Sequence, residues 1–141
     1  MKITVSDRTG RLGAADKTDI KKISSSALKA MGLPAATELS LSFIDDRSMR
    51  ELNRQWRNID RTTDVLSFPQ EGGPDYTLLG DIVISVETAE RQSARYGNTL
   101  REEIMKLIVH GALHLVGHDH KKRKEKEAMR KEEVRIMLRL K

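Results

Sequence analysis

The sequence predicts a single domain, residues 1–141, that combines about four strands with about five helices. Apolar residues alternate with polar ones in short stretches, which indicates strands, and recur at helical spacing in longer stretches, which indicates helices. Strands dominate the first part of the chain and helices the last part. The length of 141 residues lies within the size range of one domain, so we expect one core.

The predicted strands are short and separated by turn signals. Pro69 should end the third strand, and glycines with a proline at 72–75 indicate an exposed turn before the fourth, which is apolar and should be buried. The four strands are expected around residues 3–5, 39–43, 64–68 and 78–85.

The predicted helices carry recognisable start and stop signals. Asp45 is a natural N-cap for the second helix, and Thr99 with Glu102 forms a capping box that opens the fourth. Apolar residues occupy nearly every face of the fourth helix, so it should be buried on most sides. The expected helices cover residues 20–31, 46–56, 87–96, 100–116 and most of the charged tail after 121.

The composition excludes several classes of protein. The chain has 0 cysteines, so it can form no disulfide or zinc ribbon and has no thiol nucleophile. No window approaches the roughly 18 consecutive apolar residues of a spanning helix, and the start of the chain turns polar before a signal peptide could form. We therefore expect a cytoplasmic protein with no membrane partner.

The positive charge is concentrated at the C-terminal end. The net charge is +5, and residues 121–141 hold ten Lys and Arg against four Glu, so the rest of the chain is nearly neutral. The segment opens with Lys121, Lys122, Arg123 and Lys124. Such a segment is either a solvated helix or a surface that holds phosphates.

All four histidines lie between residues 110 and 120. His110 and His114 are one turn apart on the buried helix, so their imidazoles point the same way and can share a metal ion. Gly117 can end the helix with a positive φ and swing His120 back as a third ligand. Three histidines with an open fourth position are typical of catalytic zinc.

Two other interpretations of these histidines remain. The metal could be structural, or the imidazoles could be packed without metal. Two buried imidazoles with no acidic partner on their helix face would each need a hydrogen bond, which favours a metal. We expect His118 to lie in solvent or to contact a metal ligand without binding the metal itself. Asp119 either orients a ligating imidazole or belongs to the turn.

The spacing H-x-x-x-H-x-x-G-x-x-H is that of the metzincin metalloproteases, but Gly111 stands where their catalytic Glu would be. Without that base the site is poorly suited to peptide hydrolysis. Phosphodiester cleavage instead develops negative charge on phosphate oxygens, which a metal and a guanidinium stabilise together.

The sequence of residues 110–120, HGALHLVGHDH, resembles the H-G-x-L-H-L-x-G-x-D-H signature of the YbeY family of bacterial endoribonucleases and rRNA maturation factors. Residues 52–69 and 79–84 are similar to two further family segments, with Thr62 in place of the usual Pro, which should loosen that loop. The resemblance implies an α+β fold with a small mixed sheet, and zinc on His110, His114 and His120. It also implies that Arg57, which on residues alone would be a surface arginine, faces the metal as a phosphate-binding cation.

These features predict a metal-dependent, single-strand-specific endoribonuclease that matures the 3′ end of the small-subunit rRNA and acts in ribosome quality control. We expect one zinc per chain, with nickel or another divalent ion possible as isolated, and RNA, the ribosome or small-subunit proteins as partners, without DNA. The alternatives are a zinc metalloprotease-like hydrolase and a non-catalytic ribosome-associated factor with a structural metal. Asp81 and Ser67 could be structural or functional.

Overall fold

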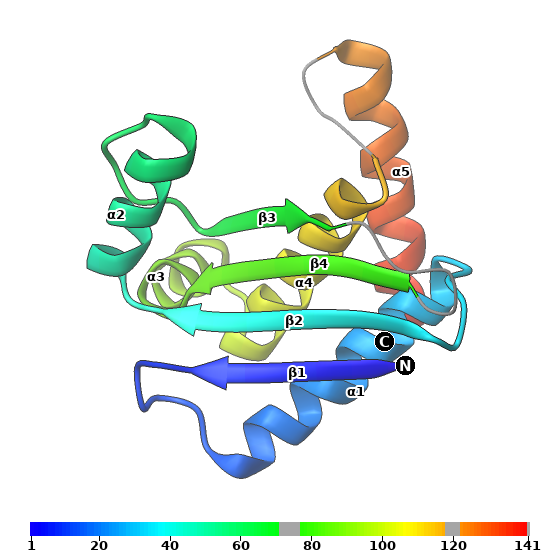
Figure 1. The fold of residues 1–141 in the computed structure, drawn as a ribbon, viewed down its shortest axis with the longest axis horizontal. Coiled ribbons are helices and arrows are strands. Elements are labelled where there is room, and N and C mark those ends of the chain that lie inside the picture. The colour runs from blue at the N-terminus through cyan, green and yellow to red at the C-terminus, as the bar shows by residue number, and fades with distance from the viewer. Residues whose placement is uncertain (71–76, 118–121, 141) are drawn as a thin grey trace.

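The computed structural model describes residues 1–70, 77–117 and 122–140. Within these residues it has four strands and five helices, as predicted (Figure 1). The predicted turn at 72–75 lies outside the described residues. The elements in chain order are β1 (Lys2–Asp7), α1 (Ala14–Ala30), β2 (Thr37–Ile44), α2 (Asp46–Arg57), β3 (Val65–Pro69), β4 (Thr77–Ser85), α3 (Val86–Tyr96), α4 (Leu100–Leu115) and α5 (Arg123–Leu140).

The strands form one mixed sheet in the order β1-β2-β4-β3. The three strands β1, β2 and β4 are parallel, and β3 runs antiparallel to β4 at the edge. The antiparallel pair reverses the chain locally, whereas the parallel pairs need the crossovers through α1 and α2. The predicted α+β class with a small mixed sheet is therefore confirmed.

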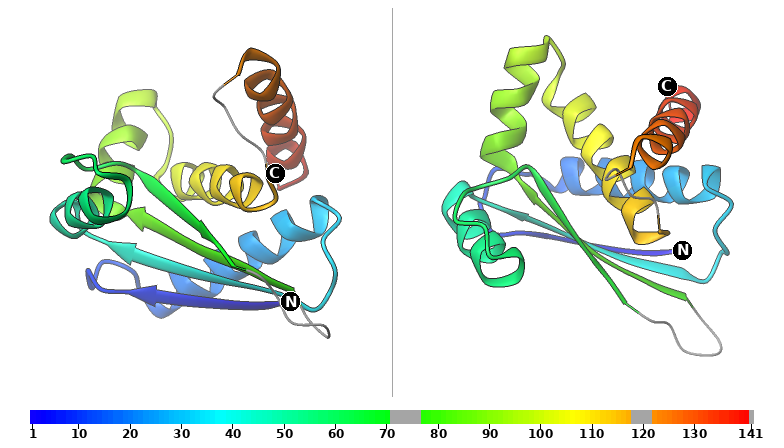
Figure 2. Two further views of the ribbon diagram at one scale, coloured as in Figure 1. Left: turned by 45° about the horizontal axis from the view of Figure 1, so that its top comes forward. Right: turned by 90° about the horizontal axis from the view of Figure 1, so that it is seen from above.

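The helices divide unequally between the two faces of the sheet (Figure 2). The main core joins alternate residues of β2 and β4, such as Phe43 and Ile82, to α1, α3 and α4. On the other face, Met49 of α2 packs with Leu66 and Val83. Helix α5 packs against α4 and α1 rather than against the sheet, and its Met129 and Ile136 are buried there.

Helix α4 lies very close to the sheet at Gly111. A Cβ at this position would meet Ile82 Cγ2 at 3.0 Å and the Ser67 hydroxyl oxygen at 3.1 Å. The Ser67 hydroxyl also donates a hydrogen bond to the Gly111 carbonyl at 3.1 Å. Gly111 is thus required by packing, and Ser67 has a structural role.

The predicted helix caps are present. The Asp45 side chain accepts a hydrogen bond from the Ser48 amide at 2.8 Å. Thr99 and Glu102 form the reciprocal capping box at the start of α4. Beyond the last turn of α4, Gly117 has φ +101°, as the predicted helix stop requires. Among the helices that the structure describes, none is both long and apolar enough to cross a membrane.

Asp46 ties the start of α2 to the start of α3. Its carboxylate accepts hydrogen bonds from the Ser85 hydroxyl at 2.7 Å, the Thr88 hydroxyl at 2.6 Å and the Arg91 guanidinium at 2.7 Å. Burial by itself would raise the pKa of Asp46, but the hydrogen bonds from Arg91, Thr88 and Ser85 lower it to about 2. The Thr62 hydroxyl also lies 3.4 Å from this carboxylate, which links the loop after α2 to the start of the same helix.

Candidate functional site

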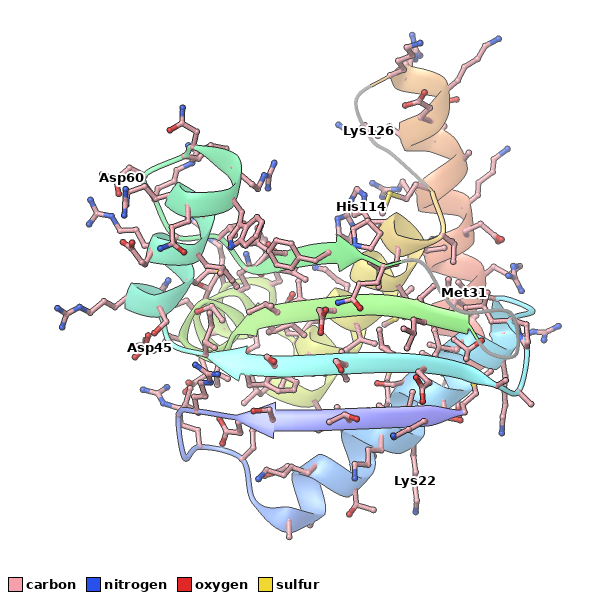
Figure 3. All side chains as sticks on the ribbon, in the orientation of Figure 1. Lys22, Met31, Asp45, Asp60, His114 and Lys126 are labelled. Atoms are coloured by element: carbon pink, nitrogen blue, oxygen red, sulfur yellow. The ribbon has the colours of Figure 1, made fainter. Side chains whose placement is uncertain are left out.

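His110 and His114 meet at the C-terminal end of α4, as their spacing predicts (Figure 3 labels His114). Their Nε2 atoms are 3.2 Å apart, and the ring centroids are 4.7 Å apart with 74° between the planes. Two nitrogens that each lie 2.0–2.1 Å from a tetrahedral zinc are separated by about 3.3–3.4 Å. The separation of the two Nε2 atoms matches the spacing of two ligands of one ion, and it also matches a hydrogen bond between the two rings.

Glu133 of α5 lies on the other side of the His110 ring. Its Oε1 is 2.6 Å from His110 Nδ1. Both side chains are partly exposed, with 33% of the His110 side chain and 28% of the Glu133 side chain accessible. The expectation of buried imidazoles is wrong, because the His110 side chain is partly exposed. Its acidic partner comes from α5, which is distant in sequence, and not from the face of α4.

His118, Asp119 and the predicted third ligand His120 lie outside the described residues. Within 1–70, 77–117 and 122–140, no three His, Cys, Asp or Glu side chains form a group that could hold a metal. The described part of the chain contains two of the three predicted ligands.

Arg57 is the last residue of α2 and is exposed. Asn58 follows it in the left-handed conformation, with φ 57°, and ends the helix. Arg50 pairs with Asp60 and Arg54 pairs with Glu51, whereas no salt bridge of Arg57 is found among the residues that the structure describes. The guanidinium of Arg57 is thus available to an anionic ligand.

The loop after Arg57 is held against α2. The buried Asn53 side chain donates a hydrogen bond to the Arg61 carbonyl at 2.8 Å. Trp56 is 68% exposed, and its ring lies edge-on to Phe68 of β3, with the centroids 5.8 Å apart. These contacts fix the tip of α2 beside β3.

The tip of α2 and the histidines border the same edge strand. In Figure 1, α2 and α5 rise beyond β3 near its opposite ends, and Figure 3 shows His114 on the side of α5, below Lys126, with Asp60 of the α2 loop on the opposite side of the view. The edge strand β3 is thus bounded by a cationic helix tip at one end and an imidazole pair at the other.

Comparisons with known proteins decide the family. The model of the family described as "Endoribonuclease YbeY" matches residues 3–141. The chain belongs to this family. A protein named Endoribonuclease YbeY from Pelotomaculum thermopropionicum is 40% identical over 99% of this chain and 97% of its own length. Another of that name, from Aquifex aeolicus, is 50% identical over 79% of this chain and 74% of its own length.

The fold agrees with a solved relative. The solution structure of a Thermotoga maritima protein matches with a TM-score of 0.65 and 25% identity, over 98% of this chain and 88% of that one. The predicted resemblance to the YbeY family and the predicted enzyme class, an endoribonuclease and thus a hydrolase, are confirmed.

The basic segment of this YbeY-family chain opens α5. Lys122, Arg123 and Lys124 are exposed, and Arg123 pairs with Glu127 at 3.3 Å, while Lys121 lies outside the described residues. Figure 1 shows that this first turn of α5 stands away from the sheet. The three described cations are therefore accessible to solvent.

Asp81 does not lie with the histidines. It pairs in register with Phe68, whereas the neighbouring Ile82 faces Gly111 of α4. Because side chains alternate along a strand, Asp81 points to the opposite face of the sheet. There it accepts a hydrogen bond from Gln70 at 2.6 Å and lines a pocket of about 210 Å³.

Proposed function

We propose that this YbeY-family protein cleaves single-stranded RNA with the help of one divalent metal ion. The convergence of His110 Nε2 and His114 Nε2 at 3.2 Å carries the proposal, because this separation fits two ligands of one tetrahedral ion. The names of the relatives support RNA as the substrate.

The residues that would hold the ion are His110, His114 and His120. Zinc is the ion that we propose, since an all-nitrogen donor set suits it, although nickel or another divalent ion could also bind. When bound, such an ion supplies Lewis-acid stabilisation of a phosphate oxygen or an activated water. The carboxylate of Glu133 lies against His110 Nδ1, so the Nε2 side of that ring faces the site.

Arg57 is the proposed phosphate-binding cation. Its planar guanidinium can donate two parallel hydrogen bonds to phosphate oxygens, which lysine cannot do. Its exposure at the end of α2 supports this role, as does its neighbour Trp56, whose ring contacts Phe68 of β3. The residue would bind the scissile phosphate and stabilise the charge that develops on it.

The biological substrate that we propose is rRNA, cleaved at the 3′ end of the small-subunit RNA during maturation and ribosome quality control. The partners would then be the ribosome or its small-subunit proteins, in the cytoplasm. The basic turn at Lys121, Lys122, Arg123 and Lys124 would hold flanking phosphates without reading sequence.

Metal analysis combined with cleavage assays on structured and unstructured RNA tests this proposal. We expect about one metal ion per chain and cleavage of the unstructured RNA alone. A cyclic phosphate at the new 3′ end would identify the ribose 2′-OH as the nucleophile, and its absence would indicate water. A metal-free protein with full cleavage activity would contradict the proposal.

The geometry opposes the metalloprotease alternative. A side chain at position 111 would point into Ile82 and Ser67 rather than toward the imidazoles. The peptidase base therefore has no place in this helix, and a casein-type substrate should remain uncut.

A further inference from the structure

Helix α5 contributes a carboxylate to a site whose predicted ligands all lie in or just beyond α4. Glu133 Oε1 is 2.6 Å from His110 Nδ1, and the opposite nitrogen of the same ring, Nε2, is 3.2 Å from His114 Nε2. The His110 ring is therefore held from one side and directed toward His114 on the other.

The packing of α5 fixes the position of this carboxylate. Glu133 follows Met129 by four residues and precedes Ile136 by three, so the three share one helix face. Met129 is 2% exposed and Ile136 is 0% exposed, both in the cluster with Val109 and Leu113 of α4. Arg135 also donates a hydrogen bond to the Ala30 carbonyl at 3.0 Å, which ties α5 to α1.

The contact with Glu133 decides which ring nitrogen of His110 carries the proton. A carboxylate accepts a hydrogen bond from Nδ1–H, so it favours the tautomer that carries its proton on Nδ1. The lone pair of His110 is then on Nε2, the atom that faces His114. A carboxylate behind a ligating histidine fixes the ring and raises the basicity of its ligating nitrogen.

We propose that Glu133 is a positioning residue, which holds His110 in the Nδ1–H tautomer and directs its Nε2 lone pair to a divalent metal. This inference rests on the proposed metal site. Helix α5 would then have two roles. Its basic first turn would contact phosphates, and its Glu133 would hold the proposed ligand His110 of α4 in position.

The competing explanation is a surface ion pair that only attaches α5 to α4. Such a pair would contribute little stability at this degree of exposure and would not affect metal affinity. Zinc affinity distinguishes the two explanations, since a simple attachment would leave it unchanged in the folded protein. The His110 tautomer tests whether the carboxylate accepts from Nδ1–H, as the proposal requires.

The experiment compares the full-length protein with Glu133→Ala and Glu133→Gln, using zinc alone as the probe and a chelator as competitor. Glu127→Gln, which removes a carboxylate from an exposed pair on the same helix, is the matched control. His114→Ala reports on the metal site itself. We expect Glu133→Ala to weaken zinc binding by about 100-fold and Glu133→Gln by about 10-fold, because Gln keeps an acceptor oxygen but not the charge.

Long-range ¹H–¹⁵N spectra of the metal-free wild type at alkaline pH should show His110 protonated on Nδ1, and this measurement needs no variant to fold. An Nε2–H tautomer would overturn the proposal. Wild-type zinc affinity in both Glu133 variants, with zinc lost in His114→Ala, would overturn it and leave the metal site standing. Unchanged affinity in His114→Ala as well would remove the metal site, and the proposal with it.

Discussion

The two parts of the proposed active site are built in opposite ways. His110 and His114 lie on a helix that is packed by the sheet and by α1, α3 and α5, and the His110 ring is fixed from behind by Glu133. Arg57 lies on an exposed helix tip with solvent around its guanidinium. A change among the histidines should therefore affect metal and stability together, whereas a change at Arg57 should affect the rate of cleavage alone.

Loss of His114 should have the largest effect. Since His114 Nε2 converges with His110 Nε2 at 3.2 Å, His114→Ala should remove most of the bound zinc and most RNA cleavage. Zinc stabilises the folded protein because it binds the folded state and not the unfolded chain. The variant that has lost zinc should therefore unfold at a temperature several degrees lower than wild type. Elemental analysis and calorimetry measure these effects, and full zinc occupancy in His110→Ala, His114→Ala, His120→Ala together would contradict the ligand assignment.

The contact between α4 and the sheet should be the next most sensitive. Gly111→Glu would drive a carboxylate into Ile82 and Ser67 and should destabilise the fold by at least about 3 kcal/mol. Gly111→Ala should lie between this variant and wild type. Gly13→Ala is the control, because its Cβ would meet only Asp16 Oδ2 at 3.6 Å. A Gly111→Glu protein with the wild-type urea midpoint would show that α4 can move off the sheet.

The attachment of α2 should be sensitive to acid. The pKa of Asp46 is lowered from 3.8 to about 2, so its contribution to the free energy of unfolding is complete above the unfolded value and is lost as the pH falls through about 2. The shift corresponds to about 2 kcal/mol. Asp46→Asn should therefore be less stable than wild type at pH 7, and the gap should narrow between pH 4 and pH 2 in urea titrations.

Asp60→Asn is the control for that experiment, since Asp60 is exposed and pairs with Arg50 at the surface. A gap between wild type and Asp46→Asn that stays constant down to pH 2 would show that the Asp46 carboxylate is not responsible.

Arg57 should affect cleavage without affecting metal or stability. Arg57→Lys keeps the charge but loses the planar guanidinium that can donate two parallel hydrogen bonds to a phosphate. Single-turnover cleavage should therefore slow by at least about tenfold. Arg50→Lys, in the ion pair with Asp60, is the control. If Arg57→Ala cleaves RNA at the wild-type rate, another cation has this role, and Arg54 and Arg61 are the next to test.

The basic turn of α5 should have the smallest effect, confined to RNA affinity. Each phosphate contact on a single strand contributes about 0.7 to the slope of log affinity against log salt. Changing the four cations at 121–124 to Gln should flatten that slope by about one to three units, with little effect on cleavage at saturating RNA. Lys21→Gln with Lys22→Gln on α1 is the control, and an unchanged slope would show that this turn is only solvated helix.

The sequence predicted the elements well, because periodicity and capping are local properties. Thr99 with Glu102 begins α4, and the spacing of His110 and His114 places both on one face. The contact of Glu133 with His110 joins residues 23 positions apart and depends on how α5 packs, so spacing within α4 could not reveal it. Its only signal was a glutamate on the apolar stripe of Met129 and Ile136.

The face of Asp81 was equally hidden from the sequence. Alternation along β4 predicts that Asp81 and Ile82 point to opposite faces, but it does not say which face receives α4. That choice depends on the order of strands in the sheet and on the packing of α1, α3 and α4 against one of its faces. Both are properties of the assembled sheet.

Removal and return of the metal in the wild-type protein test the central claim most directly. Cleavage of a single-stranded RNA is measured before chelation, after chelation at a temperature where the protein stays folded, and after zinc is added back. The account predicts that cleavage is lost with the metal and recovered with about one zinc per chain. Undiminished cleavage by the folded, metal-free protein would contradict the account. Any metal bound by His110 and His114 would then have only a structural role.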